Sequence, residues 1–188
     1  MKCHPSQTSI TTYVTLHPHD PVWFDRFERE RERIGTTVPD MLDVFHIGST
    51  AIPDLPSKTT LDAVAVFEDA ETMATARDAL YDDGFGPHRD DPDWIVVTRS
   101  GGEYDVCLHL RPRKHDTWCD QIVFREYLRG NVRARARYER AKRAAAATHP
   151  GDVDAYVDAK ESSILSLVRE AYDRGYDERL PDYASRGQ

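Results

Sequence analysis

Residues 46–67 read "HIGSTAIPDLPSKTTLDAVAVF", and this stretch decides the predicted fold. A turn of small residues, Gly48-Ser49-Thr50, follows an apolar step and precedes an apolar strand that carries a single aspartate, Asp62. An unpaired carboxylate buried in a sheet would destabilise the fold by several kcal/mol. We therefore expect Asp62 to face a cation, a hydrogen-bonding cluster or a cleft.

Apolar patterns place this stretch in a mixed α/β chain. Strands are predicted at 41–48, 59–67, 93–100 and 102–113, with a shorter one at 11–17. Helices are predicted at 22–35, 69–85, 120–130 and 132–151, and a long amphipathic helix begins at Asp152. The 188 residues predict one domain of α/β (α+β) class, a mixed sheet flanked by helices with a C-terminal helical extension. We expect its sheet-containing core at about 12–115 and its helical part at about 116–176.

Charge and cysteine usage narrow the function classes. The formal net charge is -8, from 33 acidic and 25 basic residues, which disfavours a general binder of nucleic-acid backbones. Helix arginines such as Arg133, Arg137 and Arg140 could bind RNA. The other interpretation is that they form solvated ion pairs with nearby glutamates. Three cysteines without a CxxC spacing indicate reduced thiols. No apolar run has the length of a membrane span, so we expect a cytoplasmic protein away from membranes.

The Gly48-Ser49-Thr50 turn has two interpretations. Small residues that leave a strand let backbone amides approach an anion closely, which suits a phosphate group. A plain tight turn would show the same residues. Lys58, in the loop that follows, could neutralise phosphate charge, or it could be a solvated surface lysine.

Polar side chains alternate along the predicted strand at 102–113. Asp105, Cys107 and His109 share one face of it. If this strand neighbours the strand of Asp62 in matching register, Asp105 and His109 join Asp62 in one site. Asp105 is then a candidate carboxylate ligand, and His109 a metal ligand or an acid–base group near neutral pH. The alternative is that Asp105 and His109 face water and that Cys107 is a small buried residue.

The spacing around the turn resembles the signature of the polymerase-beta-type nucleotidyltransferase superfamily. Gly48-Ser49 is followed by the twelve residues 50–61 and then by Asp62 with its apolar neighbours. The whole stretch 46–67 resembles the central motif of the GrpB family within that superfamily. The segments "HPHDPVWFDRFERER", "CLHLRPR", "FREYLRGN", "YERAK" and "YVDAKESSI" extend this resemblance over about residues 12–172. The last two segments each pair a tyrosine with a lysine.

The resemblance implies a phosphoryl-transfer type of site. In the superfamily the Gly-Ser turn holds the nucleotide's phosphates, and three carboxylates hold two divalent metals for in-line transfer. The residues that would contact the ligand or its phosphates are Gly48, Ser49, Thr50, Lys58 and Arg125. The candidate catalytic and metal-binding residues are Asp62, Asp105 and His109. Oxygen ligands would suit Mg²⁺ or Mn²⁺, whereas His109 with Cys107 would tilt the site towards Zn²⁺.

The chain differs from the family pattern in the loop that follows the Gly-Ser turn. In the next predicted strand it lacks a carboxylate that active transferases have. Asp54 stands where glycine is common, Thr59 follows Lys58 where proline is common, and Cys107 replaces the first histidine of a His-x-His pair. Val64 stands where an active transferase carries its second carboxylate, and the family shares this feature. A two-metal site is harder to build without that carboxylate, and the charge of Asp54 would repel a phosphate close to it.

Two functional hypotheses follow. The leading one is a cleft that binds a nucleotide or another phosphorylated small molecule, with metal-dependent nucleotidyl or phosphoryl transfer as its candidate reaction. The alternative is a non-catalytic binding or regulatory module that kept the turn and lost the metal pair. Val64 favours the alternative.

Overall fold

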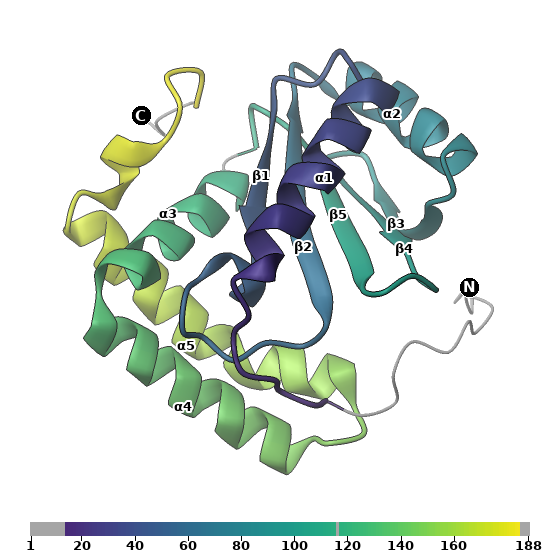
Figure 1. The fold of residues 1–188 in the computed structure, drawn as a ribbon. Coiled ribbons are helices and arrows are strands. Elements are labelled where there is room, and N and C mark those ends of the chain that lie inside the picture. Colours follow the sequence, from purple (N-terminus) through teal and green to yellow (C-terminus); the bar gives the residue numbers. More distant parts are fainter. Residues whose placement is uncertain (1–13, 116, 185–188) are drawn as a thin grey trace.

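A five-stranded mixed sheet forms the centre of the protein (Figure 1). The computed structural model describes residues 14–115 and 117–184. The strands are β1 (Asp43–Ile47), β2 (Thr60–Phe67), β3 (Gly86–Asp91), β4 (Trp94–Arg99) and β5 (Asp105–Pro112), in the spatial order β1-β2-β5-β4-β3. β2 and β5 run parallel, and the other neighbouring strands run antiparallel. The predicted α/β class with a mixed sheet is thus confirmed.

The described residues form five α-helices. They are α1 (Val22–Thr37), α2 (Ala70–Asp82), α3 (Thr117–Gly130), α4 (Val132–Thr148) and α5 (Val153–Asp173), and two short 3₁₀ turns are η1 (Ser49–Ala51) and η2 (Tyr176–Arg179). Asp69, Asn131 and Asp152 precede α2, α4 and α5, and each side chain accepts a hydrogen bond from a backbone N–H of the first turn. These caps satisfy donors that the helix itself cannot pair. None of the described helices combines the length and apolar character needed to cross a lipid bilayer.

Two elements differ from the sequence predictions. β3 was not predicted, because its sequence "GPHRDD" is polar and largely exposed and pairs only with β4 at the sheet edge. Charged and proline-containing edge strands lack the apolar alternation from which strands are predicted. The short strand predicted at 11–17 lies partly outside the described residues, and in its described part His17 forms an isolated bridge with Ser57.

The two faces of the sheet pack on different helices. On one face, Leu61, Ala65 and Phe67 of β2 belong to a core with α1 and α2. On the other face, Val64 and Val66 pack with residues of α3. Successive strand residues point to opposite faces, so Asp62 shares the face of Val64 and Val66.

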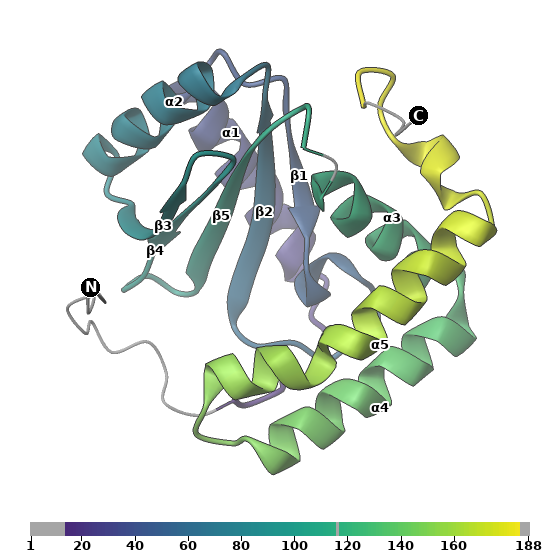
Figure 2. The same ribbon diagram turned by 180° about the vertical axis from the view of Figure 1, so that it is seen from behind.

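The segment between β1 and β2 lies between the sheet and the C-terminal helices (Figure 2). Ile52 and Leu55 of this segment are buried in one cluster with residues of α3, α4 and α5, including Tyr127, Tyr138 and Leu167. The apolar contacts therefore hold the Gly-Ser turn against the helical part of the fold.

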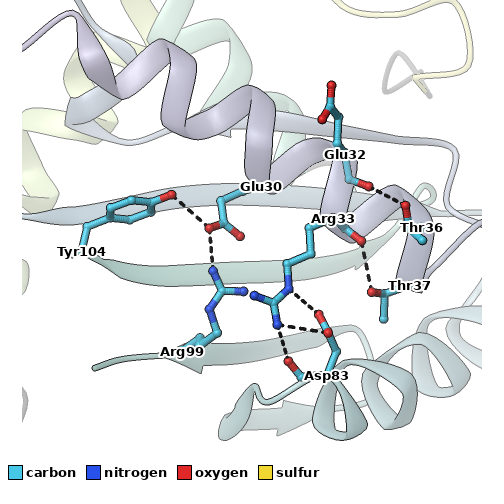
Figure 3. A network of polar contacts seen from close by, with 8 residues as sticks. All are labelled: Glu30, Glu32, Arg33, Thr36, Thr37, Asp83, Arg99 and Tyr104. Carbon is cyan, nitrogen blue, oxygen red and sulfur yellow. Dashed lines mark hydrogen bonds and ion pairs between the residues drawn. The ribbon is translucent and has the colours of Figure 1, made fainter. Parts of the chain in front are cut away.

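A polar network fixes α1 over the sheet and against the end of α2 (Figure 3). The buried Glu30 of α1 accepts hydrogen bonds from Arg99 of β4 at 2.5 Å and from the Tyr104 hydroxyl at 3.1 Å. Arg33 of α1 binds the Asp83 carboxylate at 2.8 and 3.0 Å. These partners are at least 50 positions from α1 residues in the sequence, so the contacts fix the position of α1 relative to distant parts of the chain.

Asp54 adopts the left-handed backbone region that favours glycine. Its φ is 63°, which explains why a glycine is compatible with this position. Its carboxylate is exposed and forms an ion pair with Arg135 at 3.3 Å. The departure from the family pattern is therefore accommodated at the surface.

We expect Asp54→Gly to change the free energy of unfolding by less than about 1 kcal/mol, because relief of the backbone offsets loss of an exposed ion pair. Asp54→Val, with a β-branched side chain at the same φ, should cost about 1–2 kcal/mol more. Urea unfolding of both variants measures this difference. Equal stabilities would contradict a backbone constraint at residue 54.

Candidate functional site

A cavity of about 200 Å³ lies between the Gly-Ser turn and the C-terminal helices. The turn residues Gly48, Ser49 and Thr50 line one side, with Lys58 and Asp62. Side chains of α4 and α5 line the other side. Five of the residues predicted to bind ligand or metal therefore share one cavity, which we call the lysine pocket. Asp54 is not among its lining residues.

Gly48 and Asp62 are in tight contact. Ile47 is paired with Asp62 in the β1–β2 ladder, so the turn begins beside the aspartate. Gly48 has a φ of 67°, and a Cβ atom added there would lie 2.5 Å from Oδ2 of Asp62. The backbone conformation and the neighbouring carboxylate both require glycine.

Gly48→Ala should lower the free energy of unfolding by at least about 2 kcal/mol, the sum of the left-handed strain and the overlap with Asp62. Gly101→Ala is the matched control, because Gly101 has a φ of 92° and no heavy atom within 4 Å of an added Cβ. In urea unfolding, the free energy of unfolding should fall by at least about 1 kcal/mol less in Gly101→Ala than in Gly48→Ala. Equal losses would exclude the steric contribution of Asp62.

Two tyrosine–lysine pairs complete the lysine pocket. Tyr138 and Lys142 lie four residues apart on α4, and Tyr156 and Lys160 lie four apart on α5, so each pair shares a helix face. Lys142 is only 1% exposed. Its Nζ donates to Oγ of Ser49 at 2.6 Å and to the Pro56 carbonyl. A buried ammonium thus connects α4 directly to the Gly-Ser turn.

Burial and mutual repulsion alter the ionisation of these groups. Burial first, and then the charge of Lys160, lowers the pKa of Lys142 to about 7. Burial and the charge of Lys58 lower the pKa of Lys160 to about 8. Burial raises the pKa of Asp62, although the three lysines oppose this shift. An anion among the lysines would reduce their repulsion and favour their charged forms.

Lys142 should make the stability of the fold increase above pH 7. Between pH 7 and the ordinary lysine value of 10.5, the unfolded chain keeps the Lys142 proton and the folded chain does not. The unfolded state then binds more protons, so the free energy of unfolding rises with pH by up to about 1.4 kcal/mol per unit. Below pH 7 Lys142 is charged in the folded state as well, so burial of its ammonium group lowers the free energy of unfolding by its full amount. Lys142→Met should remove the contribution of Lys142 to this pH dependence, and Lys160, with a pKa of about 8, keeps its own contribution above pH 8.

Urea unfolding of wild type and Lys142→Met from pH 6 to pH 10 tests this expectation. The stability of wild type relative to the variant should increase across that range. Lys114→Met is the control, since Lys114 is exposed and lies outside the lysine pocket, and its stability should run parallel to that of wild type. A parallel curve for Lys142→Met would contradict the lowered pKa. The charged groups that act on Lys142 are Lys58, Asp62, Glu139 and Lys160.

The parallel pairing of β2 with β5 places Asp62 beside Cys107. Ligand atoms of Asp62, Cys107 and His109 lie within 4.8 Å of one another. Asp105 pairs with Thr60, two positions earlier, and does not belong to this cluster. The sheet therefore brings two of the three predicted metal residues together and leaves the third outside.

The cluster does not fit a divalent metal in its present arrangement. Nε1 of Trp94 donates to Nδ1 of His109 at 3.2 Å, so the neutral imidazole carries its proton on Nε2, which lies 3.7 Å from the Cys107 sulfur. Burial lowers the pKa of His109 to about 4 and raises the pKa of the Cys107 thiol. Asp62 alone then offers an anionic donor, whereas Mg²⁺ and Mn²⁺ prefer several oxygen ligands.

Arg125 lies outside the lysine pocket. Its Nη1 donates to the His46 carbonyl at 2.8 Å and its Nε to Glu126 at 2.8 Å. It lines a separate cavity of about 320 Å³ together with His46 and Arg129. On α4, Arg137 pairs with Glu170 at 2.8 Å, as a solvated helix face would.

Lys142, Lys160 and their tyrosine neighbours were not predicted from the sequence to belong to the site. A signal was present, because the chain has only five lysines and three of them line this cavity. The repeated Tyr-x-x-x-Lys spacing was a second signal. Neither signal could place two distant helices against the Gly-Ser turn.

Comparisons with known proteins identify related sequences. The family model described as GrpB protein matches residues 13–170. A UPF0157 protein of Halalkalibacterium halodurans is 31% identical and the match covers 84% of this chain and 82% of that protein. A UPF0157 protein of Streptomyces coelicolor is 32% identical, with 84% of both chains covered. A dephospho-CoA kinase of Mycolicibacterium paratuberculosis is 29% identical, and the match covers 85% of this chain but 46% of that protein.

Solved structures with the same fold include GrpB of Enterococcus faecalis. Its TM-score is 0.76 at 22% sequence identity, and the match covers 85% of this chain and 98% of that one. A cytoplasmic RNA terminal U-transferase matches with a TM-score of 0.50 at 11% identity, over 66% of this chain and 41% of that one. At these identities the likeness concerns the fold alone.

Proposed function

The chain belongs to the GrpB family and has a nucleotidyltransferase-like fold, and we propose that its lysine pocket binds a nucleotide or another phosphorylated small molecule. The observation that supports this most directly is the convergence of Lys58, Lys142 and Lys160 on one cavity. Lys58 and Lys160 have no hydrogen-bonding or ion-pairing partner among the described residues. Ammonium groups gathered in this way repel one another unless an anion lies between them.

The Gly-Ser turn suits a phosphate group on the opposite side of the cavity. Gly48 is exposed to the cavity and lacks a side chain that would keep a ligand away from the backbone. Ser49 supplies a hydroxyl that accepts from Lys142 and interacts with the Tyr138 hydroxyl, and a phosphate oxygen could take the place of Tyr138 as the acceptor of its proton. Lysine and hydroxyl donors then approach the same anion from two sides.

The relative named as a dephospho-CoA kinase supports a nucleotide-bearing ligand. The segment similar to this chain makes up less than half of that protein. A kinase of that name acts on a phosphorylated nucleotide derivative, so a module joined to it belongs to a protein that binds such a compound. Dephospho-CoA is therefore one of the first compounds to test.

Phosphoryl or nucleotidyl transfer is the second candidate function. The contact of Asp62 with the Gly-Ser turn favours it, because the superfamily resemblance predicts a carboxylate at that place. Val64 disfavours it, since this residue is fully buried on the α3 side and supplies no second carboxylate. Asp62→Ala should abolish turnover if the pocket is catalytic and leave ligand binding intact if the protein is a non-catalytic module.

We expect phosphorylated ligands to raise the melting temperature of the wild-type protein in a thermal-shift screen. The screen contains inorganic phosphate, mononucleotides and dephospho-CoA. Lys58→Met and Lys160→Met should each weaken binding by about 10- to 100-fold, because each removes a charge-assisted hydrogen bond worth about 1.5–3 kcal/mol.

Lys114→Met is the matched control for this screen, because it removes the same charge from the surface outside the pocket. Its ligand-induced shifts should equal those of wild type. If Lys114→Met weakened binding as much as Lys160→Met, the effect would reflect net charge alone and the proposed pocket would be wrong. Far-UV circular dichroism verifies that each variant is folded.

A further inference from the structure

The lysine pocket has more positive than negative charge. Lys58, Lys142 and Lys160 carry three positive charges when protonated, and Asp62 carries the one negative charge among the lining residues, which leaves a net charge of +2. Asp62 forms no direct ion pair with a lysine in residues 14–115 and 117–184. Its carboxylate therefore does not neutralise a particular ammonium. A dianion would balance the pocket.

The residues needed to hold divalent metals are not assembled around Asp62. Val64, two positions along β2, is buried in the apolar cluster with α3. Asp105 is opposite Thr60 and outside the Asp62 cluster. His109 directs an N–H towards Cys107 because its other nitrogen accepts from Trp94. One carboxylate facing three ammonium groups is an unfavourable environment for a dication.

The position of Lys142 is set by the protein and not by a ligand. Its ammonium is held by Oγ of Ser49 and by the Pro56 carbonyl, at the turn that contacts Asp62. The Tyr138 and Tyr156 rings are buried beside Lys142 and Lys160, and Lys160 lies 3.9 Å from the Tyr156 centroid. Protein contacts therefore hold two of the three positive groups, Lys142 and Lys160, before any ligand binds.

We infer that the lysine pocket binds a dianionic phosphate group without a divalent metal, and that its ammonium groups supply the positive charge in the place where the superfamily uses divalent metals. This inference rests on the proposed function and defines its ligand as a phosphate monoester or terminal phosphate that is not complexed by metal. A metal-complexed phosphate carries less negative charge and binds the pocket more weakly. Asp62 opposes the bound anion electrostatically and does not serve as a metal ligand.

Inorganic phosphate is the probe for this inference. Isothermal titration of the full chain, at constant ionic strength, compares binding in EDTA with binding in millimolar Mg²⁺ or Mn²⁺. The expected dissociation constants differ by less than about twofold between EDTA and Mg²⁺, after correction for phosphate bound by the metal. Sulfate, which stays a dianion near neutral pH, should bind in EDTA as well.

Asp62→Asn separates the two types of site, because it keeps the shape of the side chain and removes its charge. For a lysine-only site the affinity for phosphate stays the same or increases. For a metal site the affinity falls at least tenfold, since a ligand of the metal is lost. Lys160→Met should weaken phosphate binding at least tenfold with or without metal, and Lys58→Met is the second variant should Lys160→Met not fold.

The outcomes distinguish this inference from the proposed function. Phosphate binding that requires Mg²⁺ or Mn²⁺ and is lost in Asp62→Asn overturns the inference and leaves a phosphate-binding pocket. The absence of any phosphate or sulfate binding, with or without metal, overturns both. Equal binding in EDTA and Mg²⁺ that persists in Asp62→Asn and is lost in Lys160→Met supports both.

Discussion

The contact between Gly48 and Asp62 is the constraint on which the site depends. The β1–β2 ladder pairs Ile47 with Asp62, so the chain must turn directly beside a carboxylate. Only a residue without a side chain, in the left-handed region, makes that turn without overlapping Asp62. The same geometry keeps the carboxylate in the lining of the cavity and leaves Gly48 of the turn exposed.

The helical part of the chain contributes as much to the site as the sheet does. Apolar contacts of Ile52 and Leu55 with α3–α5 hold the segment after the turn, and Lys142 adds a polar connection through Ser49 and Pro56. Burying an ammonium group is unfavourable, and the lowered pKa of Lys142 is the consequence of that burial. A lysine in this position would be replaced easily by an apolar residue if packing were its only role. The proposed binding of phosphate would account for a positive charge in this position.

The sequence predicted the fold class, four of the five strands and the Gly-Ser turn because these depend on local patterns. It also predicted that Asp62 and His109 lie together if the strands are adjacent, and the β2–β5 register meets that condition. β3 could not be predicted because its polar residues lack an apolar period. The contributions of Lys142 and Lys160 depend on the packing of α4 and α5 against residues about 90 positions earlier in the chain, which helical periodicity does not encode.

The arrangement of charges suggests how one sheet geometry can serve two kinds of phosphate site. In a two-metal site several carboxylates bind the metal cations, and these cations coordinate the phosphate oxygens. Here one carboxylate remains beside the turn, an apolar valine is buried under α3 where a second would stand, and lysines from a loop and two helices provide the cations. Ammonium groups are part of the chain, so they do not have to be recruited from solution as metal ions are. On the function that we propose, this surface would bind phosphate without the metal ligands that usually accompany such a site.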